Sequence, residues 1–291
     1  MVSQQVLNAL GIGCTYALVS LGYSLTFGTL RVVNVAYGEV FMFSAMAAVG
    51  ANAVLPHPTI VVASALLTAV LLGLGVHLLA VRPLGRVSDV NAPAHLSVVV
   101  STMGCSIVLQ NTALALFGGY PRPFPHIFSS KAAVLASGLV TNFGVLVGGV
   151  LALALTAALA ILLRRMPLGL EMRAIAENPT LAGLSGISVP RIELMTVAIS
   201  SLLAGAGALL VGEIVGTISP FIGLQYGMKS IVIIVVGGAR NPIGTVMVAF
   251  ALAGAEVLAV ALGFSTYRDG IAFLLLLLVG AGRSVRARRS E

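Results

Sequence analysis

Long uncharged apolar runs, separated by short polar gaps, extend from one end of the chain to the other. The first thirty residues carry no charged side chain except at their boundary with Arg31, and a bilayer crossing needs only about 20 apolar residues. The apolar runs cover residues 5–30, 34–55, 59–81, 93–118, 132–163, 194–212, 222–238, 243–265 and 270–282. This pattern predicts an all-α, polytopic transmembrane helical bundle of about eight or nine spans, with residues 1–291 forming a single membrane domain.

Three of these runs depart from a simple span. Residues 132–163 are longer than one crossing needs, so we expect their outer part to be a tilted or broken helix. The runs 222–238 and 243–265 contain Lys229 and Glu256, respectively. Charged side chains within spans are costly in lipid, and they therefore favour helices that face the bundle interior or a polar pathway.

Composition excludes a soluble enzyme. The chain is 58 % hydrophobic and 9 % charged, and its mean hydropathy is +1.08, whereas about a quarter of the residues of a soluble domain are charged. The net charge is +7, and most of the basic residues lie in short gaps between apolar runs. This placement indicates membrane topology rather than nucleic-acid binding. An arrangement of nine spans with the N-terminus outside and the C-terminus inside places most of the arginines on the inner side.

No motif for an energy source or for catalysis is present. The sequence lacks a G-x-x-x-x-G-K-[ST] nucleotide loop, an H-E-x-x-H motif and a G-x-S-x-G elbow. The glycine-rich segment 237–244 has neither the lysine nor the Ser/Thr of a nucleotide loop, so we expect a tight turn there. The four histidines are scattered, which argues against a metal site. The chain is therefore not expected to be an enzyme or to hold a cofactor of its own.

Polar residues at the start of the second span are the first candidate site. Asn34, Tyr37, Gly38 and Glu39 lie within or beside an apolar run, where a carboxylate and an amide are costly unless they meet partners or water. They are either a polar element of a translocation pathway or a satisfied cluster that fixes helix packing. The buried amide pair predicted at Gln110 and Asn111 leaves the same two alternatives open.

The segment 164–193 is the longest charged stretch of the chain, and the assumed topology places it on the inner face. Asn178 followed by Pro179 predicts the start of a short helix that Gly186 can end, and a second helix start follows at residues 188–190. Because links between helices usually take about 2–8 residues, this length favours a docking surface for an inner partner over a solvated hairpin.

Motifs along nearly the whole chain resemble a known family. Residues 7–11, 16–18, 21–23 and the segment Asn34-Val35-Ala36-Tyr37-Gly38-Glu39 are similar to the opening of permease subunits of branched-chain amino acid ABC importers (the LivH type). Members typically have "N-F-A-H-G-E" at that last motif, so Val35 and Tyr37 depart from it. The resemblance continues at residues 82–84, 106–111, 172–178, 182–187 and 237–244.

The resemblance implies that this permease works with a second, related permease subunit, two ATP-binding subunits and a soluble substrate-binding protein, in a bacterial-type inner membrane. ATP and Mg²⁺ would be bound by the partner subunits. Segment 164–193 would couple the permease to the ATPase, with Arg173, Glu177 and Asn178 in the contact and Gly186 as the helix stop. Asn34, Gly38 and Glu39 would line or brace the pathway of an alternating-access transporter for leucine, isoleucine or valine.

Other functions remain as alternatives. An ABC permease of the same family could carry urea, short amides or other small acids. A secondary transporter coupled to an ion gradient would use Glu39, Glu213 and Glu256 as its proton or ion sites and would need no ATPase. A membrane-embedded enzyme would need a nucleophile–base pair, which the sequence does not provide.

Overall fold

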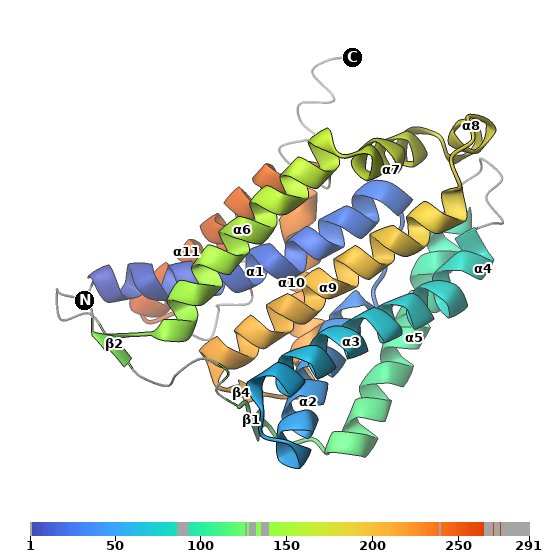
Figure 1. Ribbon diagram of the computed structural model, residues 1–291. Coiled ribbons are helices and arrows are strands. Elements are labelled where there is room, and N and C mark those ends of the chain that lie inside the picture. The colour runs from blue at the N-terminus through green and yellow to red at the C-terminus, as the bar shows by residue number, and fades with distance from the viewer. Residues whose placement is uncertain are drawn as a thin grey trace.

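The computed structural model describes residues 2–85, 93–125, 127, 132–134, 140–238, 240–264, 270 and 274, and it is almost entirely helical (Figure 1). Its helices are α1 (Val2–Leu30), α2 (Tyr37–Val54), α3 (Pro58–Val76), the π-helical turn His77–Val81, α4 (Arg82–Gly85), α5 (Pro93–Phe117), α6 (Phe143–Arg165), α7 (Pro167–Glu177), α8 (Pro179–Leu184), α9 (Val189–Val215), α10 (Ile222–Gly237) and α11 (Pro242–Ala261). Its strands are β1 (Arg122–Pro123), β2 (Ala132–Val134), β3 (Val140–Asn142) and β4 (Thr217–Ile218).

The predicted all-α membrane fold is confirmed. Among the described residues, six segments are long and apolar enough to cross a membrane, and they belong to α1, α3 with its extension to Leu84, α5, α6, α9 and α11. Helices α2 and α10 coincide with two further predicted runs. The 16 residues of α10 span only about 24 Å, less than the hydrocarbon core of about 30 Å. The last predicted run, residues 270–282, lies almost wholly outside the described residues.

The outer part of the run 132–163 differs from its prediction. Instead of a tilted or broken helix, β2 and β3 pair as a short antiparallel hairpin, with Ala132 opposite Asn142, and α6 begins only at Phe143. The helical part from Phe143 to Arg165 has 23 residues, which is enough for one crossing. The described residues that precede this helix in the run form the strands β2 and β3.

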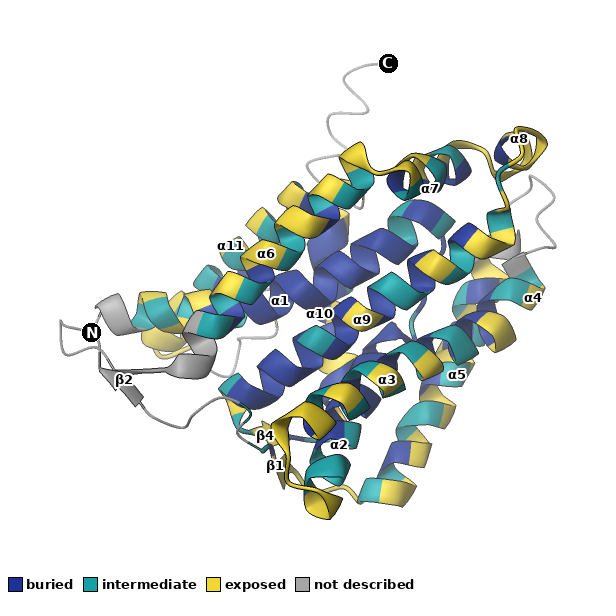
Figure 2. Cartoon of the chain, in the orientation of Figure 1, coloured by how far each residue is buried: buried dark blue, intermediate teal, exposed yellow. Residues whose placement is uncertain are grey.

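Helices α1 and α9 lie at the centre of the bundle and are buried along much of their length, whereas α3, α5, α6 and α11 expose broad apolar faces (Figure 2). Glycines permit the close approach of α1 and α9. A Cβ atom on Gly22 would lie 2.7 Å from the Ser200 carbonyl oxygen of α9, and one on Gly207 would lie 2.9 Å from a methyl carbon of Val19 in α1. The chain thus builds its core on two crossing helices that lack side chains where they meet.

Helices α1, α2 and α3 and helices α9, α10 and α11 form an inverted repeat. A shift of 185 positions carries α1, α2 and α3 onto α9, α10 and α11 with ends that agree to within two residues. The same shift carries Gly22 to Gly207 and Gly38 to Gly223. The contacts repeat as well, since α1 packs on α10 and α11 while α9 packs on α2 and α3. The two triplets run in opposite directions through the bundle (Figure 1).

Helices α2 and α10 meet near their N-termini through this repeat. A Cβ atom on Gly38 would lie 2.2 Å from the carbonyl oxygen of Gly223, and one on Gly223 would lie 2.6 Å from that of Gly38. Farther along the same contact, the rings of Phe41 and Tyr226, which the shift of 185 also relates, stack with centroids 5.3 Å apart. The crossing leaves no room for a side chain at either glycine.

We predict that Gly38→Ala and Gly223→Ala each destabilise the folded chain by about 1–3 kcal/mol, because the new methyl group would force two helix backbones apart. Gly50→Ala is the matched control, since it lies in α2 with nothing within 4 Å of an added Cβ. Thermal unfolding of the purified variants in detergent measures the effect. Equal unfolding temperatures for Gly38→Ala and Gly50→Ala would contradict the crossing.

Candidate functional site

The segment between α1 and α2 carries non-helical backbone into the bundle, and Asn34 organises it. The Asn34 side-chain oxygen Oδ1 accepts a hydrogen bond from the Ala36 amide at 3.1 Å. The main-chain carbonyl oxygen of Asn34 accepts a hydrogen bond from the Tyr23 hydroxyl at 2.9 Å. The Val35 amide donates to Oγ1 of Thr102 in α5 at 3.2 Å. Backbone groups inside a membrane need such partners, so Asn34 sustains the interruption that precedes α2.

Tyr37 fixes the first turn of α2 against the centre of the bundle. Its hydroxyl donates to the carbonyl oxygen of Ser200 at 2.8 Å, and its ring packs edge-on against Tyr23 with centroids 5.1 Å apart. Ser200 lies near the middle of α9. Helix α2 therefore begins inside the bundle, beside the interior of a spanning helix, and Tyr37 occupies this place by virtue of its ring and hydroxyl.

Glu39 is a buried carboxylate at the crossing of α2 and α10. Glu39 is only 1 % exposed, and its Oε1 accepts a hydrogen bond from the Ser106 hydroxyl of α5 at 3.2 Å. The other oxygen, Oε2, has no hydrogen-bond partner within the described residues. A Cβ atom on Gly223 would lie 2.9 Å from this oxygen. Glu39 thus directs a free acceptor toward the first turn of α10.

The prediction of a buried amide pair in α5 is wrong for Asn111. Asn111 is exposed on the surface of α5 and donates from Nδ2 to the carbonyl oxygen of Ile107 in the preceding turn at 2.8 Å, while Gln110 is half-buried. Helix α5 is peripheral, and its apolar neighbours Ile107 and Val108 are also exposed. The sequence does not indicate which face of this helix is buried, because apolar residues occur all around it.

Lys229 and Glu256, the two charges embedded in late spans, meet each other and Tyr16 of α1. Lys229 Nζ lies 2.9 Å from Oε1 of Glu256, and the Tyr16 hydroxyl donates to Glu256 Oε2 at 2.8 Å. Lys229 Nζ also donates to the Tyr16 hydroxyl at 2.8 Å. All three residues are buried. The prediction that these charges face the bundle interior is confirmed, and the triad joins α1, α10 and α11.

The carboxylates that a secondary transporter would use have different surroundings. Glu213 accepts a hydrogen bond from the Ile127 amide through Oε2 at 2.9 Å, and Glu256 pairs with Lys229. Glu39 has a buried carboxylate oxygen, Oε2, without a hydrogen-bond partner in the described part of the chain. The same described residues contain no group of three His, Cys, Asp or Glu side chains that could hold a metal ion.

The segment 164–193 contains two short helices, α7 and α8, between α6 and α9. Helix α8 lies where the sequence predicts a short helix, the start predicted at residues 188–190 is that of the long helix α9, and α7 was not predicted. Asn178 caps α8 through Oδ1, which accepts from the Thr180 and Leu181 amides at 3.0 Å each. Gly186 has a φ of +88° and follows the end of α8. The Ile187 amide then donates to the Ala182 carbonyl at 3.1 Å, which completes a glycine-terminated helix end. Asn178 and Gly186 therefore define the length of α8.

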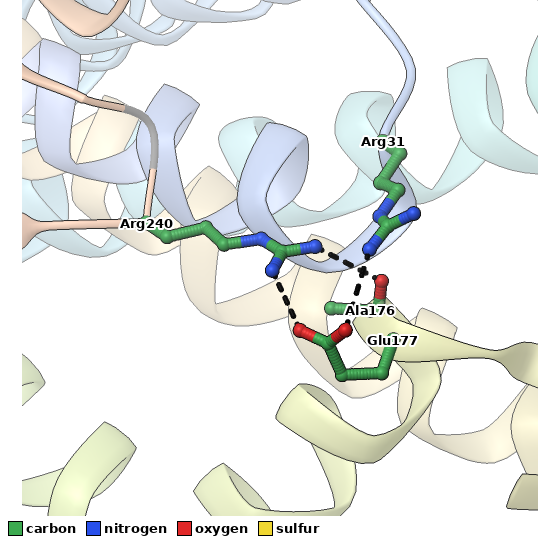
Figure 3. Close-up of polar contacts among 4 residues, drawn as sticks. All are labelled: Arg31, Ala176, Glu177 and Arg240. Atoms are coloured by element: carbon green, nitrogen blue, oxygen red, sulfur yellow. Dashed lines mark hydrogen bonds and ion pairs between the residues drawn. The ribbon is translucent and has the colours of Figure 1, made fainter.

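Glu177 at the end of α7 pairs with arginines from two distant parts of the chain (Figure 3). Oε1 lies 2.7 Å from Nη1 of Arg240, and Oε2 lies 3.8 Å from Nη2 of Arg31. Arg240 also donates to the carbonyl oxygen of Ala176 at 3.1 Å. Exposed pairs of this kind are worth only about 0–1 kcal/mol, so the cluster positions α7 against the ends of α1 and α10 more than it stabilises the fold.

Exposed leucines on the two short helices are a feature that sequence analysis missed. Leu170 of α7 and Leu181 and Leu184 of α8 are 63 %, 60 % and 81 % exposed, while Met172 and Ile175 on the opposite side of α7 are buried. We call Leu170, Leu181 and Leu184 the apolar knob. Amphipathic spacing in 167–184 could have identified them, because their positions fall opposite the residues that pack inward.

An interrupted-helix membrane bundle with two short helices at one end is the architecture of a multi-pass membrane protein and suits a transporter. Comparison with known families agrees: residues 5–280 match the model described as "Branched-chain amino acid transport system / permease component". The chain belongs to this family, and it is a multi-pass protein of the bacterial inner membrane. The predicted resemblance is confirmed.

Individual relatives extend over nearly the same length. The chain is 30 % identical to the high-affinity branched-chain amino acid transport system permease protein LivH of Salmonella typhimurium over 289 residues, which cover 95 % of this chain and 92 % of LivH. It is 28 % identical to BraD of Pseudomonas aeruginosa over 288 residues, with the same coverage. It is also 28 % identical to the ribose import permease protein RbsC of Haemophilus influenzae over 204 residues, 67 % of this chain and 62 % of RbsC.

We predict that Lys229→Met or Glu256→Leu alone destabilises the chain by about 3–5 kcal/mol, because each leaves an uncompensated buried charge. The double variant replaces both charges with apolar side chains and is expected to lose less stability than either single variant. Thermal unfolding of all four chains forms a double-mutant cycle. Losses that simply add would contradict a direct pairing of the two charges.

Proposed function

We propose that this chain is the membrane-spanning subunit of an ATP-driven importer that carries branched-chain amino acids inward by alternating access. The observation that carries the proposal is the similarity to LivH and BraD, which extends over 95 % of the chain. The match to RbsC, a permease named for ribose, makes the substrate the least constrained part, and urea or short amides remain the alternative cargo within the same mechanism.

The proposed importer needs partners that supply what this chain lacks. A second related permease would complete the pathway, two ATP-binding subunits would hold ATP and Mg²⁺, and a soluble protein would deliver the substrate. The basic residues that the positive-inside pattern places inside include Arg31 and Arg240, which lie with Glu177 at the α7 end of the bundle. We therefore place the α7–α8 end in the cytoplasm, the N-terminus outside and the C-terminus inside.

The apolar knob is the proposed contact with an ATP-binding subunit. Exposed leucines on two short, consecutive helices suit a hydrophobic groove on a partner. The Asn178 cap and the Gly186 turn hold α8 in shape for this contact. Glu177 would transmit a displacement of α7 to α1 and to the α10–α11 turn through Arg31 and Arg240. Arg173, predicted from the sequence to join this contact, lies beside Glu177 on the same helix.

The crossing of α2 and α10 is the proposed pathway element within this chain. Two helices that begin inside a membrane direct their positive N-terminal ends inward, an arrangement that transporters use to bind small charged groups. Glu39 contributes an acceptor with one free oxygen at this place. We infer that a movement of α10 relative to α2 exposes Glu39 to the passing amino acid. The Glu39 carboxylate would then accept a hydrogen bond from the ammonium group of that amino acid.

We predict that Leu181→Glu combined with Leu184→Glu abolishes co-purification of the ATP-binding subunits while membrane insertion is preserved. A carboxylate pair in an apolar contact carries a large desolvation cost. Leu55→Glu is the matched control, because Leu55 is 54 % exposed at the opposite end of α2 from the crossing. Undiminished recovery of the ATPase with the double variant would remove the apolar knob from the contact.

We also predict that Glu39→Gln lowers the uptake of labelled leucine by about tenfold or more while the amount of chain in the membrane stays unchanged. The amide keeps the size of the side chain and can still accept from Ser106, but it loses the negative charge that favours an ammonium group, an effect of about 1.5–3 kcal/mol. Uptake in whole cells, normalised to chain abundance, measures this. Full uptake would reduce Glu39 to a packing residue.

A further inference from the structure

A cavity of about 250 Å³ lies at the α7 end of the bundle, away from the crossing of α2 and α10. It is open on one side and lined by α1, α6, α7 and the start of α11. Apolar side chains form part of its wall, among them Leu25, Leu159, Leu163 and Met172. Sites for drug-sized ligands run to about 300–1,000 Å³, so this cavity suits a molecule of metabolite size with an apolar body.

Positive charge dominates the polar part of the wall. Arg164, Arg173 and Arg240 line the cavity, and Glu177 is the single carboxylate among its described lining residues. Glu177 is engaged by Arg240 and Arg31. Arg164 and Arg173 form no ion pair with any carboxylate in the described residues, and Arg173 makes only a long Nε contact of 3.4 Å with the Gly169 carbonyl oxygen. Two guanidinium groups are thus available to an anion from outside the chain.

The two arginines without an ion pair, Arg164 and Arg173, differ in where they lie on their helices. Arg164 is in the last turn of α6, where a cation favours the helix dipole and marks the cytoplasmic edge of a span. Arg173 is within α7, away from either end, so the helix dipole does not account for it. A guanidinium is the side chain best suited to bind a carboxylate through two parallel hydrogen bonds. The cavity therefore combines a carboxylate-binding rim with an apolar interior.

Arg240 connects this cavity to the position of α7. It lines the first cavity and a neighbouring one of about 510 Å³ that also contains Arg31, and it holds both Glu177 and the Ala176 carbonyl. A carboxylate ligand that binds beside Arg240 would compete with Glu177 for the same guanidinium. Occupation of the cavity would then weaken the contact that ties α7 to the ends of α1 and α10.

We propose that this cytoplasmic cavity binds a small monocarboxylate with a short apolar side chain, namely the imported branched-chain amino acid itself, and that its occupation slows the importer by loosening α7. The inference rests on the proposed function for the identity of the ligand. Arg164, Arg173 and Arg240 bind the carboxylate, the leucine and methionine side chains receive the apolar side chain, and Glu177, released from Arg240, faces the ammonium group. Accumulated product would thus limit its own import.

The test uses the complete complex in nanodiscs, without the soluble binding protein and without nucleotide. We expect saturable binding of labelled L-leucine, little competition from isoamylamine, which lacks the carboxylate, and about tenfold or greater weakening by Arg173→Gln or Arg164→Gln, one tenfold step being about 1.4 kcal/mol. Arg122→Gln, in β1 at the other end of the bundle, is the matched control. Ala160→Phe, which fills the cavity, should abolish binding.

Three results would overturn the proposal. Leucine binding that Glu39→Gln removes and Arg173→Gln leaves intact would belong to the pathway. Binding that occurs in zwitterionic lipid discs but disappears with anionic phosphatidylglycerol, or stabilisation by that lipid alone, would assign the arginines to lipid headgroups. A rate of ATP hydrolysis by the nanodisc complex that added leucine leaves unchanged would exclude the regulatory role. Leucine uptake into proteoliposomes, measured in parallel, tests the proposed function separately, since it persists if only the cavity proposal fails.

Discussion

The structure depends on the close crossing of α2 and α10, which places two helix starts inside the bundle where only glycine fits. A Cβ atom on either Gly38 or Gly223 would collide with the carbonyl oxygen of the other glycine. Non-helical backbone precedes both helices. Inside a membrane such backbone must find its own partners. Asn34, Tyr23 and Thr102 provide them for the segment before α2. The crossing thus determines where Glu39 lies and why its neighbourhood is polar.

Buried charge and exposed charge have separate functions in this fold. The triad of Tyr16, Lys229 and Glu256 is buried, and it secures α10 between α1 and α11. The cluster of Glu177, Arg31 and Arg240 is largely exposed and weak, which suits a contact that forms and breaks during a transport cycle. A rigid membrane interior is thereby joined to an adaptable end, which suits the alternating-access mechanism that we propose.

Much of the architecture could be predicted from sequence because apolar run length and helix-cap residues act locally. The spans, the Asn178 cap and the Gly186 stop depend on nearby residues alone. The inverted repeat was not predicted, because the two halves share little sequence besides the spacing of glycines. These are Gly22 with Gly207 and Gly38 with Gly223. The pairings of Glu177 with Arg31 and of Lys229 with Glu256 join residues far apart in the chain, and Asn111 lies on a helix without a polar face, so no local pattern could assign them.

Co-purification from the native membrane tests the central claim most directly. The tagged chain would be extracted in a mild detergent and the proteins that accompany it identified by mass spectrometry. The account predicts an ATP-binding subunit and a second, related permease in stable association with the chain. Recovery of the chain alone, as a homo-oligomer that takes up solute in an ion gradient without ATP, would contradict it.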